Sequence, residues 1–143
     1  MEQKENGKKM IGLIVGIAVF ALTSFGVKKF FFASPTFDMA MMEAASELNK
    51  SCPIMVDSET RLDNAVAMPN NVFQYNYTLV KLSRDEVDTA LVHENLDLSI
   101  INNVKTSPDL KIYRDNNVTM AYYYKDKDGQ YLLRLNVSPE LYK

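Results

Sequence analysis

Residues that most often build catalytic and metal sites are scarce in this chain. Its 143 residues include one cysteine, one histidine and no tryptophan. One cysteine cannot form an internal disulfide, and structural zinc needs four Cys or His ligands. Nucleophilic catalysis needs a base beside the nucleophile, and no pattern in the sequence pairs Cys52 with His93. The sequence therefore predicts a non-enzymatic protein with no metal site, no cofactor and no catalytic residue.

Glycine is also scarce, and Gly129 is the only glycine that follows Gly26. Phosphate-binding loops need several glycines in close succession, so nucleotide binding is not expected. The fragment Asp126-Lys127-Asp128-Gly129 has the beginning of a calcium loop. It lacks the later ligands and the glutamate at the twelfth position, so we interpret it as the turn of a hairpin.

Basic residues are a minority beyond the N-terminal region. Residues 30–143 contain 11 Lys and Arg against 16 Asp and Glu. An acidic domain without a basic stripe repels the phosphate backbone of nucleic acids. We therefore expect no nucleic-acid partner.

One long apolar run is present. Met10 to Val27 contains no charged residue, and a pair of lysines lies on each side of it. A bilayer core about 30 Å thick needs about 20 apolar residues in a helix. The predicted organisation is a polar tail over residues 1–9, a transmembrane helix over 10–32 that is retained as a signal anchor, and a soluble domain over 33–143.

Orientation and packing of this anchor follow from its flanks and its glycines. A short tail before a much longer domain favours a cytoplasmic N-terminus, which places the domain outside the cytoplasm, in the periplasm. A cytoplasmic domain, or a cleaved signal peptide with a secreted domain, are the alternatives. Gly12 and Gly16 form a G-x-x-x-G pattern, the candidate helix–helix contact in the membrane.

Two amphipathic helices are predicted in the domain. Ser34 and Pro35 suit the cap and first position of one, and Pro53 ends it. Its apolar face comprises Phe37, Met41, Ala44, Ala45 and Leu48. The other helix starts at a capping box of Ser83 and Glu86 and reaches about Val104. Its predicted apolar face comprises Val87, Ala90, Leu91, Leu98 and Ile101, with His93 on the opposite side near Leu96, Ile100 and Val104.

Alternating apolar and polar residues predict two hairpins. The first comprises residues 60–68 and 72–81, and the second comprises 118–124 and 131–137, with one further short strand over 53–56. Short turns imply antiparallel pairing. The predicted fold class is α+β: a two-layer domain in which an antiparallel sheet of two hairpins packs on two helices, in the order α-β-β-α-β-β.

Polar residues are dense between Cys52 and the second strand. Arg61 is close enough in sequence to pair with Asp57, Glu59 or Asp63. Asp57 also lies in an expected polar bend. Asp57, Arg61 and Asp63 are the candidate polar surface for a partner, whose replacement should abolish binding while leaving the fold intact.

The stretch P-I-x-V-D-x-x-T-R-L-D over residues 53–63, followed by Tyr75-x-Tyr77-x-Leu79, resembles a group of small bacterial proteins. These proteins are anchored by one helix or a lipid and have no assigned function. The resemblance implies a location in the bacterial envelope. It implies no active residues.

We therefore expect a single-pass membrane protein whose extracytoplasmic domain binds another envelope protein or a copy of itself. The binding surface would be an exposed sheet face, an edge strand or an acidic helix surface. The alternative is a small-ligand-binding or enzymatic domain with a pocket between sheet and helices, lined by Tyr75, Tyr77, Tyr122 and Tyr124. Such a domain should show a concave apolar pocket with converging polar groups.

Overall fold

A computed structural model describes residues 36–143 of the chain. The expected transmembrane helix over 10–32, its Gly12 and Gly16, and the expected helix start at Ser34 lie outside these residues. Between residues 36 and 143, none of the helices is both long enough and apolar enough to cross a bilayer.

The first described helix, α3, spans Phe37–Lys50. Thr36 caps it, because its hydroxyl oxygen accepts a hydrogen bond from the N–H of Met39 at 3.2 Å. Within the described residues the helix therefore begins at Phe37, with Thr36 as its cap. The predicted apolar face is confirmed at Met41, Ala44, Ala45 and Leu48, which are buried together with Ala40. Phe37 is partly buried against the same core.

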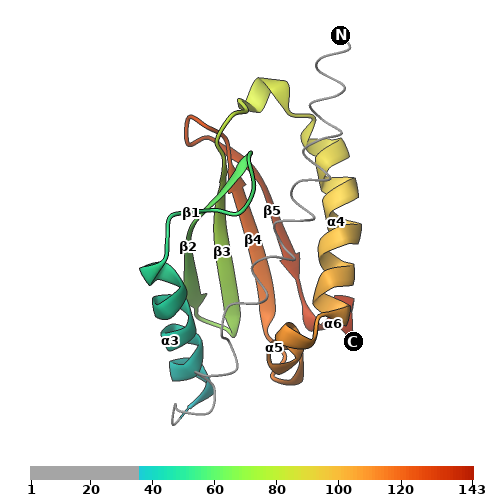
Figure 1. The fold of residues 1–143 in the computed structure, drawn as a ribbon. Coiled ribbons are helices and arrows are strands. Elements are labelled where there is room, and N and C mark those ends of the chain that lie inside the picture. The colour runs from blue at the N-terminus through green and yellow to red at the C-terminus, as the bar shows by residue number, and fades with distance from the viewer. Residues whose placement is uncertain (1–35) are drawn as a thin grey trace.

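Five strands form one mixed sheet in the order β1-β2-β3-β4-β5 (Figure 1). They span Ile54–Met55, Thr60–Met68, Val72–Leu79, Thr119–Lys125 and Tyr131–Val137. The pairs β2–β3 and β4–β5 are the two predicted hairpins. The central pair β3–β4 is parallel, so the predicted all-antiparallel sheet is wrong. The reason is the connection, since a helix between two neighbouring strands returns the chain to the end where it started.

The connection between β3 and β4 contains η1 (Arg84–Glu86), α4 (Thr89–Thr106), η2 (Pro108–Leu110) and α5 (Lys111–Asp115). A short helix, α6 (Pro139–Tyr142), follows β5. The single helix predicted to start after Ser83 is thus two helices. The predicted capping box lies at the start of η1, where the Glu86 carboxylate accepts the N–H of Ser83 at 2.7 Å. Asp88 then caps α4 by accepting the N–H of Leu91 at 3.2 Å.

The buried face of α4 differs from the predicted one. Val92, Leu96, Ile100 and Val104 are buried, whereas Leu98 is 73% exposed. The helix carries apolar residues on two sides, so spacing alone does not decide which side is buried. The buried residues repeat strictly every four positions and form one continuous row along the helix. His93 lies on the same side as Leu96, Ile100 and Val104, as predicted, but that side is the buried one.

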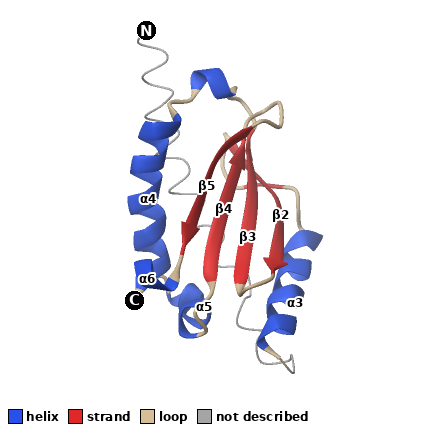
Figure 2. Cartoon of the chain, turned by 180° about the vertical axis from the view of Figure 1, so that it is seen from behind, coloured by secondary structure: helices blue, strands red, loops and turns tan. Residues whose placement is uncertain are grey.

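The α-helices between residues 36 and 143 contribute to one core on one face of the sheet. In both views α3 lies beside β2 and α4 beside β5 (Figures 1 and 2). Side chains from α3, α4, α5 and α6 join those of the sheet in a single cluster. The parallel register sets Tyr75 against Tyr122 and Tyr77 against Tyr124. These rings stack with centroids 5.4 and 4.9 Å apart.

Candidate functional site

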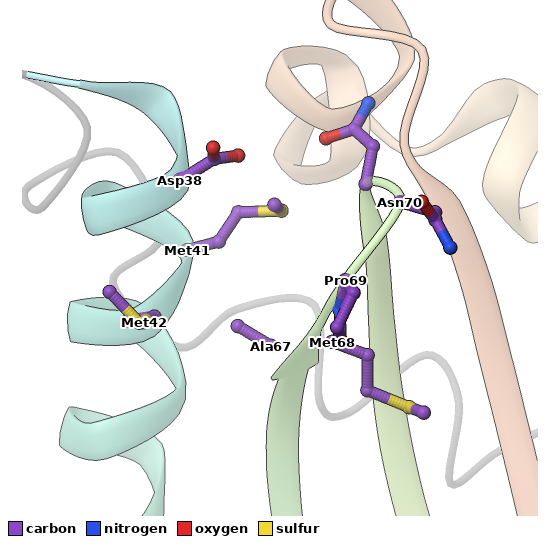
Figure 3. Close-up of a pocket in the computed structure, with 8 residues that line it drawn as sticks. Asp38, Met41, Met42, Ala67, Met68, Pro69 and Asn70 are labelled. Atoms are coloured by element: carbon purple, nitrogen blue, oxygen red, sulfur yellow. The ribbon is translucent and has the colours of Figure 1, made fainter.

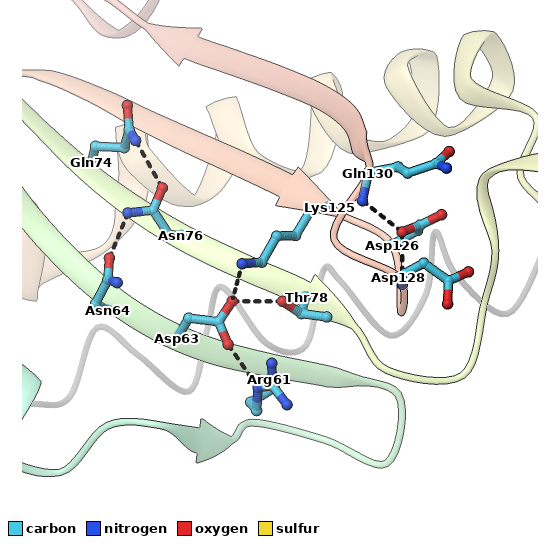
Figure 4. A network of polar contacts seen from close by, with 10 residues as sticks. All are labelled: Arg61, Asp63, Asn64, Gln74, Asn76, Thr78, Lys125, Asp126, Asp128 and Gln130. Atoms are coloured by element: carbon cyan, nitrogen blue, oxygen red, sulfur yellow. Dashed lines mark hydrogen bonds and ion pairs between the residues drawn. The ribbon is translucent and has the colours of Figure 1, made fainter.

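The opposite side of the sheet carries polar side chains, and we call it the open face. Alternation along each strand turns these side chains away from the helical layer. The register aligns Arg61, Thr78, Lys125 and Tyr131 in one row across four strands. The next row contains Asn64, Asn76, Tyr123 and Arg134. Figure 4 shows the contacts of Asp63 with Arg61, Thr78 and Lys125, and those that link Gln74, Asn76 and Asn64.

Asp63 is the centre of the charged contacts on the open face. Its Oδ1 pairs with Nε of Arg61 at 2.7 Å. Its Oδ2 accepts the hydroxyl of Thr78 at 2.5 Å and lies 3.6 Å from Nζ of Lys125. A bulge in β2 between Leu62 and Asn64 places Asp63 there. The predicted pairing of Arg61 with Asp63 is confirmed.

Asp57 does not join this group. Its Oδ1 accepts the backbone N–H groups of Glu59 and Thr60, both at 2.7 Å. These bonds close the turn between β1 and β2, as an Asx turn does. Of the three candidate residues, the structure therefore brings Arg61 and Asp63 together and places Asp57 in the bend.

Amide side chains continue the open face beyond Asp63. Gln74 donates to Oδ1 of Asn76 at 2.7 Å, and Asn76 donates to Oδ1 of Asn64 at 2.6 Å. On the other side, Nε of Arg134 donates to Oδ1 of Asn136 at 3.0 Å. The ring of Tyr131 lies 5.4 Å from that of Tyr123.

The alternating patterns predicted that Gln74, Asn76, Thr78, Arg134 and Asn136 lie on the sheet face that is solvated or meets a partner, and their position on the open face is confirmed. Asn64, Tyr123 and Tyr131 were not predicted to lie there. For Tyr123 the alternation contained the signal, because every second residue of a half-buried strand points away from the core. Asn64 and Tyr131 reach the open face because a bulge beside each of them interrupts the alternation.

A second feature is the α3–β2 groove, which lies between the first half of α3 and the end of β2. It has a volume of about 540 Å³ and is lined by Asp38, Met41, Met42, Ala67, Met68, Pro69, Asn70 and Asn71. Figure 3 shows Met41 pointing from the helix toward the strand and its turn. Asn70 and Asn71 form the rim with φ values of 64° and 62°, a region that asparagine tolerates. The turn at this position was predicted, but the groove was not.

The edge of β2 that faces away from β3 borders this groove at Ala67. Next to β1, Leu62 pairs with Ile54. Further along, the side chain of Asn49 accepts the N–H of Ala65 at 2.7 Å and donates to its C=O at 2.8 Å. The register is regular from Ala65 to Ala67, so the N–H and C=O of Ala67 point to the same edge. Within residues 36–143 no strand pairs with that edge at Ala67.

The tyrosines of the alternative hypothesis do not line this groove. Tyr75, Tyr77, Tyr122 and Tyr124 are buried in the core, each at most 5% exposed. Burial raises the pKa of Tyr77 and of Tyr122 well above the ordinary value for a phenol. The structure therefore assigns these rings to packing, and the tyrosine-lined pocket is not supported.

Cys52 and His93 also have structural environments. The thiol of Cys52 donates to the C=O of Leu48 at 3.4 Å, and burial raises its pKa. Nδ1 of His93 lies 3.0 Å from Oδ1 of Asp97, one turn further along α4. Across residues 36–143, no three His, Cys, Asp or Glu side chains are grouped to hold a metal ion.

Comparison with known proteins gives a family and a fold. The model of a family described as a domain of unknown function, DUF8479, matches residues 36–133. This match agrees with the resemblance to proteins that have no assigned function. None of the curated proteins matches the sequence.

Solved structures with a similar fold come from three bacteria. A protein of Pseudomonas aeruginosa to which secretion is ascribed has a TM-score of 0.63 at 7% identity, over 77% of this chain and 100% of its own. The type II secretion system pilotin AspS of Vibrio cholerae has a TM-score of 0.54 at 14% identity, over 73% and 90%. The pilotin EpsS from the type 2 secretion system of Vibrio vulnificus has a TM-score of 0.58 at 11% identity, over 74% and 91%. At these identities the likeness is one of fold.

Proposed function

Since the chain belongs to the DUF8479 family, a domain of unknown function, we propose its role from its fold and its surface. It is a non-enzymatic accessory protein of the bacterial envelope. Its domain binds a segment of another envelope protein in the α3–β2 groove. The apolar segment over residues 10–32 anchors it in the membrane, with the domain outside the cytoplasm.

The observation that carries this proposal is the open edge of β2 beside an apolar groove. An incoming extended segment gains backbone hydrogen bonds at Ala67, as in other cases of strand addition. Met41 and Met42 supply flexible, polarisable side chains that adapt to a partner side chain. Met42 is 56% exposed, so burying it on binding removes apolar surface from water.

Charge at the groove defines the chemistry of the segment. Asp38 is the one charged residue in the lining, and it is exposed. A segment with an apolar side chain directed at Met41 and a Lys or Arg directed at Asp38 satisfies both features. Asn49 already occupies the edge at Ala65, so strand addition is limited to the end of β2.

The fold supports an accessory role. Two of the solved structures with this fold are described as pilotins of type II secretion systems, and the third is ascribed to secretion. These descriptions agree with an extracytoplasmic protein that acts through a protein partner. The sequence before the described range is consistent with a membrane anchor, because the run from Met10 to Val27 contains no charged residue.

Site-specific photocrosslinking in living cells tests the groove. A photoreactive phenylalanine analogue at Met42 of the full chain should give one discrete adduct on irradiation. The same analogue at Met39 is the matched control, because Met39 lies on the same helix and is 41% exposed but does not line the groove. Equal adducts at the two positions, or none at Met42, contradict the proposal. An adduct of twice the mass of this chain means that the partner is a second copy.

A reporter fused after Lys143 tests the location. A reporter that is active only outside the cytoplasm should be active on the full chain. Activity of a reporter that works only in the cytoplasm would reverse the proposed orientation. This result is independent of the groove, because it depends on the anchor alone.

A further inference from the structure

Charge is distributed unevenly over the domain. The described chain contains more acidic than basic residues, 16 against 11. The open face has the opposite balance, with Arg61, Lys125 and Arg134 against Asp63. Asp63 pairs with Arg61 at 2.7 Å and lies 3.6 Å from Nζ of Lys125, so three cations and one carboxylate leave these side chains with a net charge of +2. The open face is therefore a local site for anions on an acidic domain.

Four planar amides contribute hydrogen-bonding groups to the open face: Gln74, Asn76, Asn64 and Asn136. Gln74 donates to Asn76 and Asn76 donates to Asn64, so the chain of bonds runs in one direction. Its last member, Asn64, is exposed and keeps its own amide N–H groups for a ligand. Asn136, also exposed, accepts from Arg134 and offers its N–H groups in the same way. Side chains with both donors and acceptors match the hydroxyl groups of a sugar.

An aromatic pair lies beside the cations. Tyr131 is 47% exposed, and its ring is supported at 5.4 Å by that of Tyr123. Tyr123 stands in the same row as Arg134, and Tyr131 in the same row as Lys125. A sugar ring that lies on Tyr131 would place its carboxylate near one of these cations. The row from Asn64 to Arg134 crosses four strands, a span of about 14 Å, which is long enough for an extended chain.

We propose that the open face binds a glycan that carries carboxylate groups. The tyrosines contact the sugar rings, Arg134 and Lys125 contact carboxylates, and Asn64 and Asn136 contact hydroxyls. A glycan fits better than a nucleic acid, whose dense phosphate charge is repelled by the acidic remainder of the domain. With the domain outside the cytoplasm, as in the proposed function, the bacterial cell wall is the natural source of such a polymer. The inference does not depend on the α3–β2 groove.

Co-sedimentation of the full chain in detergent with isolated cell-wall sacculi tests this inference. The wild type should sediment with the sacculi. The double variant K125A/R134A should lose at least about fivefold in bound fraction, because two of three cations are removed. Lys105→Ala is the matched control, since Lys105 is an exposed cation on α4, in the helical layer. It should bind like the wild type, and so should Met42→Lys in the groove.

Tyr131→Ala should also reduce binding, and thermal unfolding of each variant shows that the fold is retained. Sacculi whose carboxylates have been converted to amides should no longer bind the wild type. Soluble oligogalacturonate should compete for the sacculi, and a neutral oligoglucoside of the same length should not.

Three results overturn the inference. They are unchanged binding by K125A/R134A, equal binding to amidated sacculi, and competition by single-stranded DNA at lower concentration than by oligogalacturonate. Loss of crosslinking at Met42 with retained sedimentation would contradict partner binding in the groove but not glycan binding on the open face. The reverse pattern would contradict the glycan site alone.

Discussion

The side-chain amide of Asn49 forms both backbone hydrogen bonds of Ala65, accepting its N–H at 2.7 Å and donating to its C=O at 2.8 Å. A neighbouring strand would form the same two bonds. A side chain from the last turn of α3 thus provides the hydrogen bonds that a neighbouring strand would form at this edge of β2. Two of the predictions below follow from this contact.

The first prediction concerns stability. Asn49→Ala should lower the free energy of unfolding by about 1–3 kcal/mol, because it leaves both backbone groups of Ala65 without a partner. Urea unfolding measures the change. Asn95→Ala is a matched control, since the Asn95 amide donates to the C=O of Leu91 on an exposed helix surface. A loss for Asn49→Ala no greater than that of the control would contradict the role assigned to Asn49.

The second prediction separates binding from folding at the β2 edge. Ala67→Pro removes the N–H that points into the groove, and proline is tolerated where an edge N–H faces away from the sheet. We expect the Met42 crosslink to be lost while the free energy of unfolding changes by less than about 1 kcal/mol. Ala65→Pro should instead destabilise the fold, because its N–H is bonded to Asn49. Undiminished crosslinking by Ala67→Pro would exclude strand addition at this edge.

The third prediction is a pH dependence at the β4–β5 turn. Burial would raise the pKa of Asp126, but backbone N–H groups of Gln130, Arg84 and Asp128 bond its carboxylate and hold the pKa below its ordinary value. A pKa that is lower in the folded state stabilises the fold above the unfolded-state pKa of about 4. This stabilisation is lost as the pH falls from there through the folded-state pKa.

The free energy of unfolding of wild type and Asp126→Asn, measured from neutral to acidic pH, tests this dependence. The difference between the two should be constant at neutral pH and shrink below pH about 4. Asp128→Asn is the control, because Asp128 is exposed and only its backbone N–H bonds Asp126. A difference for Asp126→Asn that does not change with pH would contradict the prediction.

The fourth prediction uses two buried tyrosine hydroxyls. The hydroxyl of Tyr124 is buried and has no hydrogen-bond partner among the described residues, whereas that of Tyr142 donates to the C=O of Val118 at 2.8 Å. Tyr124→Phe should leave stability unchanged or raise it by about 1 kcal/mol, and Tyr142→Phe should lower it by about 1 kcal/mol. Thermal or urea unfolding measures both. Equal losses in the two variants would show that Tyr124 has a partner.

Local patterns predicted the elements better than their arrangement. The alternation of Phe73, Tyr75 and Tyr77 predicts a half-buried strand because the period of two belongs to the strand itself. The parallel pairing of Tyr75 with Tyr122 depends on how the chain returns through α4, which no local period encodes. On α4 itself, two sides carry apolar residues, and packing against the rest of the core selects the row that includes Leu96.

The same distinction holds for the candidate sites. Arg61 and Asp63 lie two residues apart, so a pairing between them was among the contacts that the sequence predicted. The groove brings Met41 together with Ala67, residues from different elements, and its shape depends on how α3 lies beside β2. Packing between elements creates such a feature, and residue spacing within one element does not reveal it.

The parallel pair at the centre of the sheet makes each half of the chain incomplete. The first half of the sheet ends in β3 and the second begins with β4. Each of these two strands has one unpaired edge until β3 and β4 pair with each other. The connection between them is long, so this step closes a large loop and is expected to be the slowest part of folding. Shortening α4 by a few turns would prevent the two hairpins from meeting in register, although neither hairpin would have lost a residue.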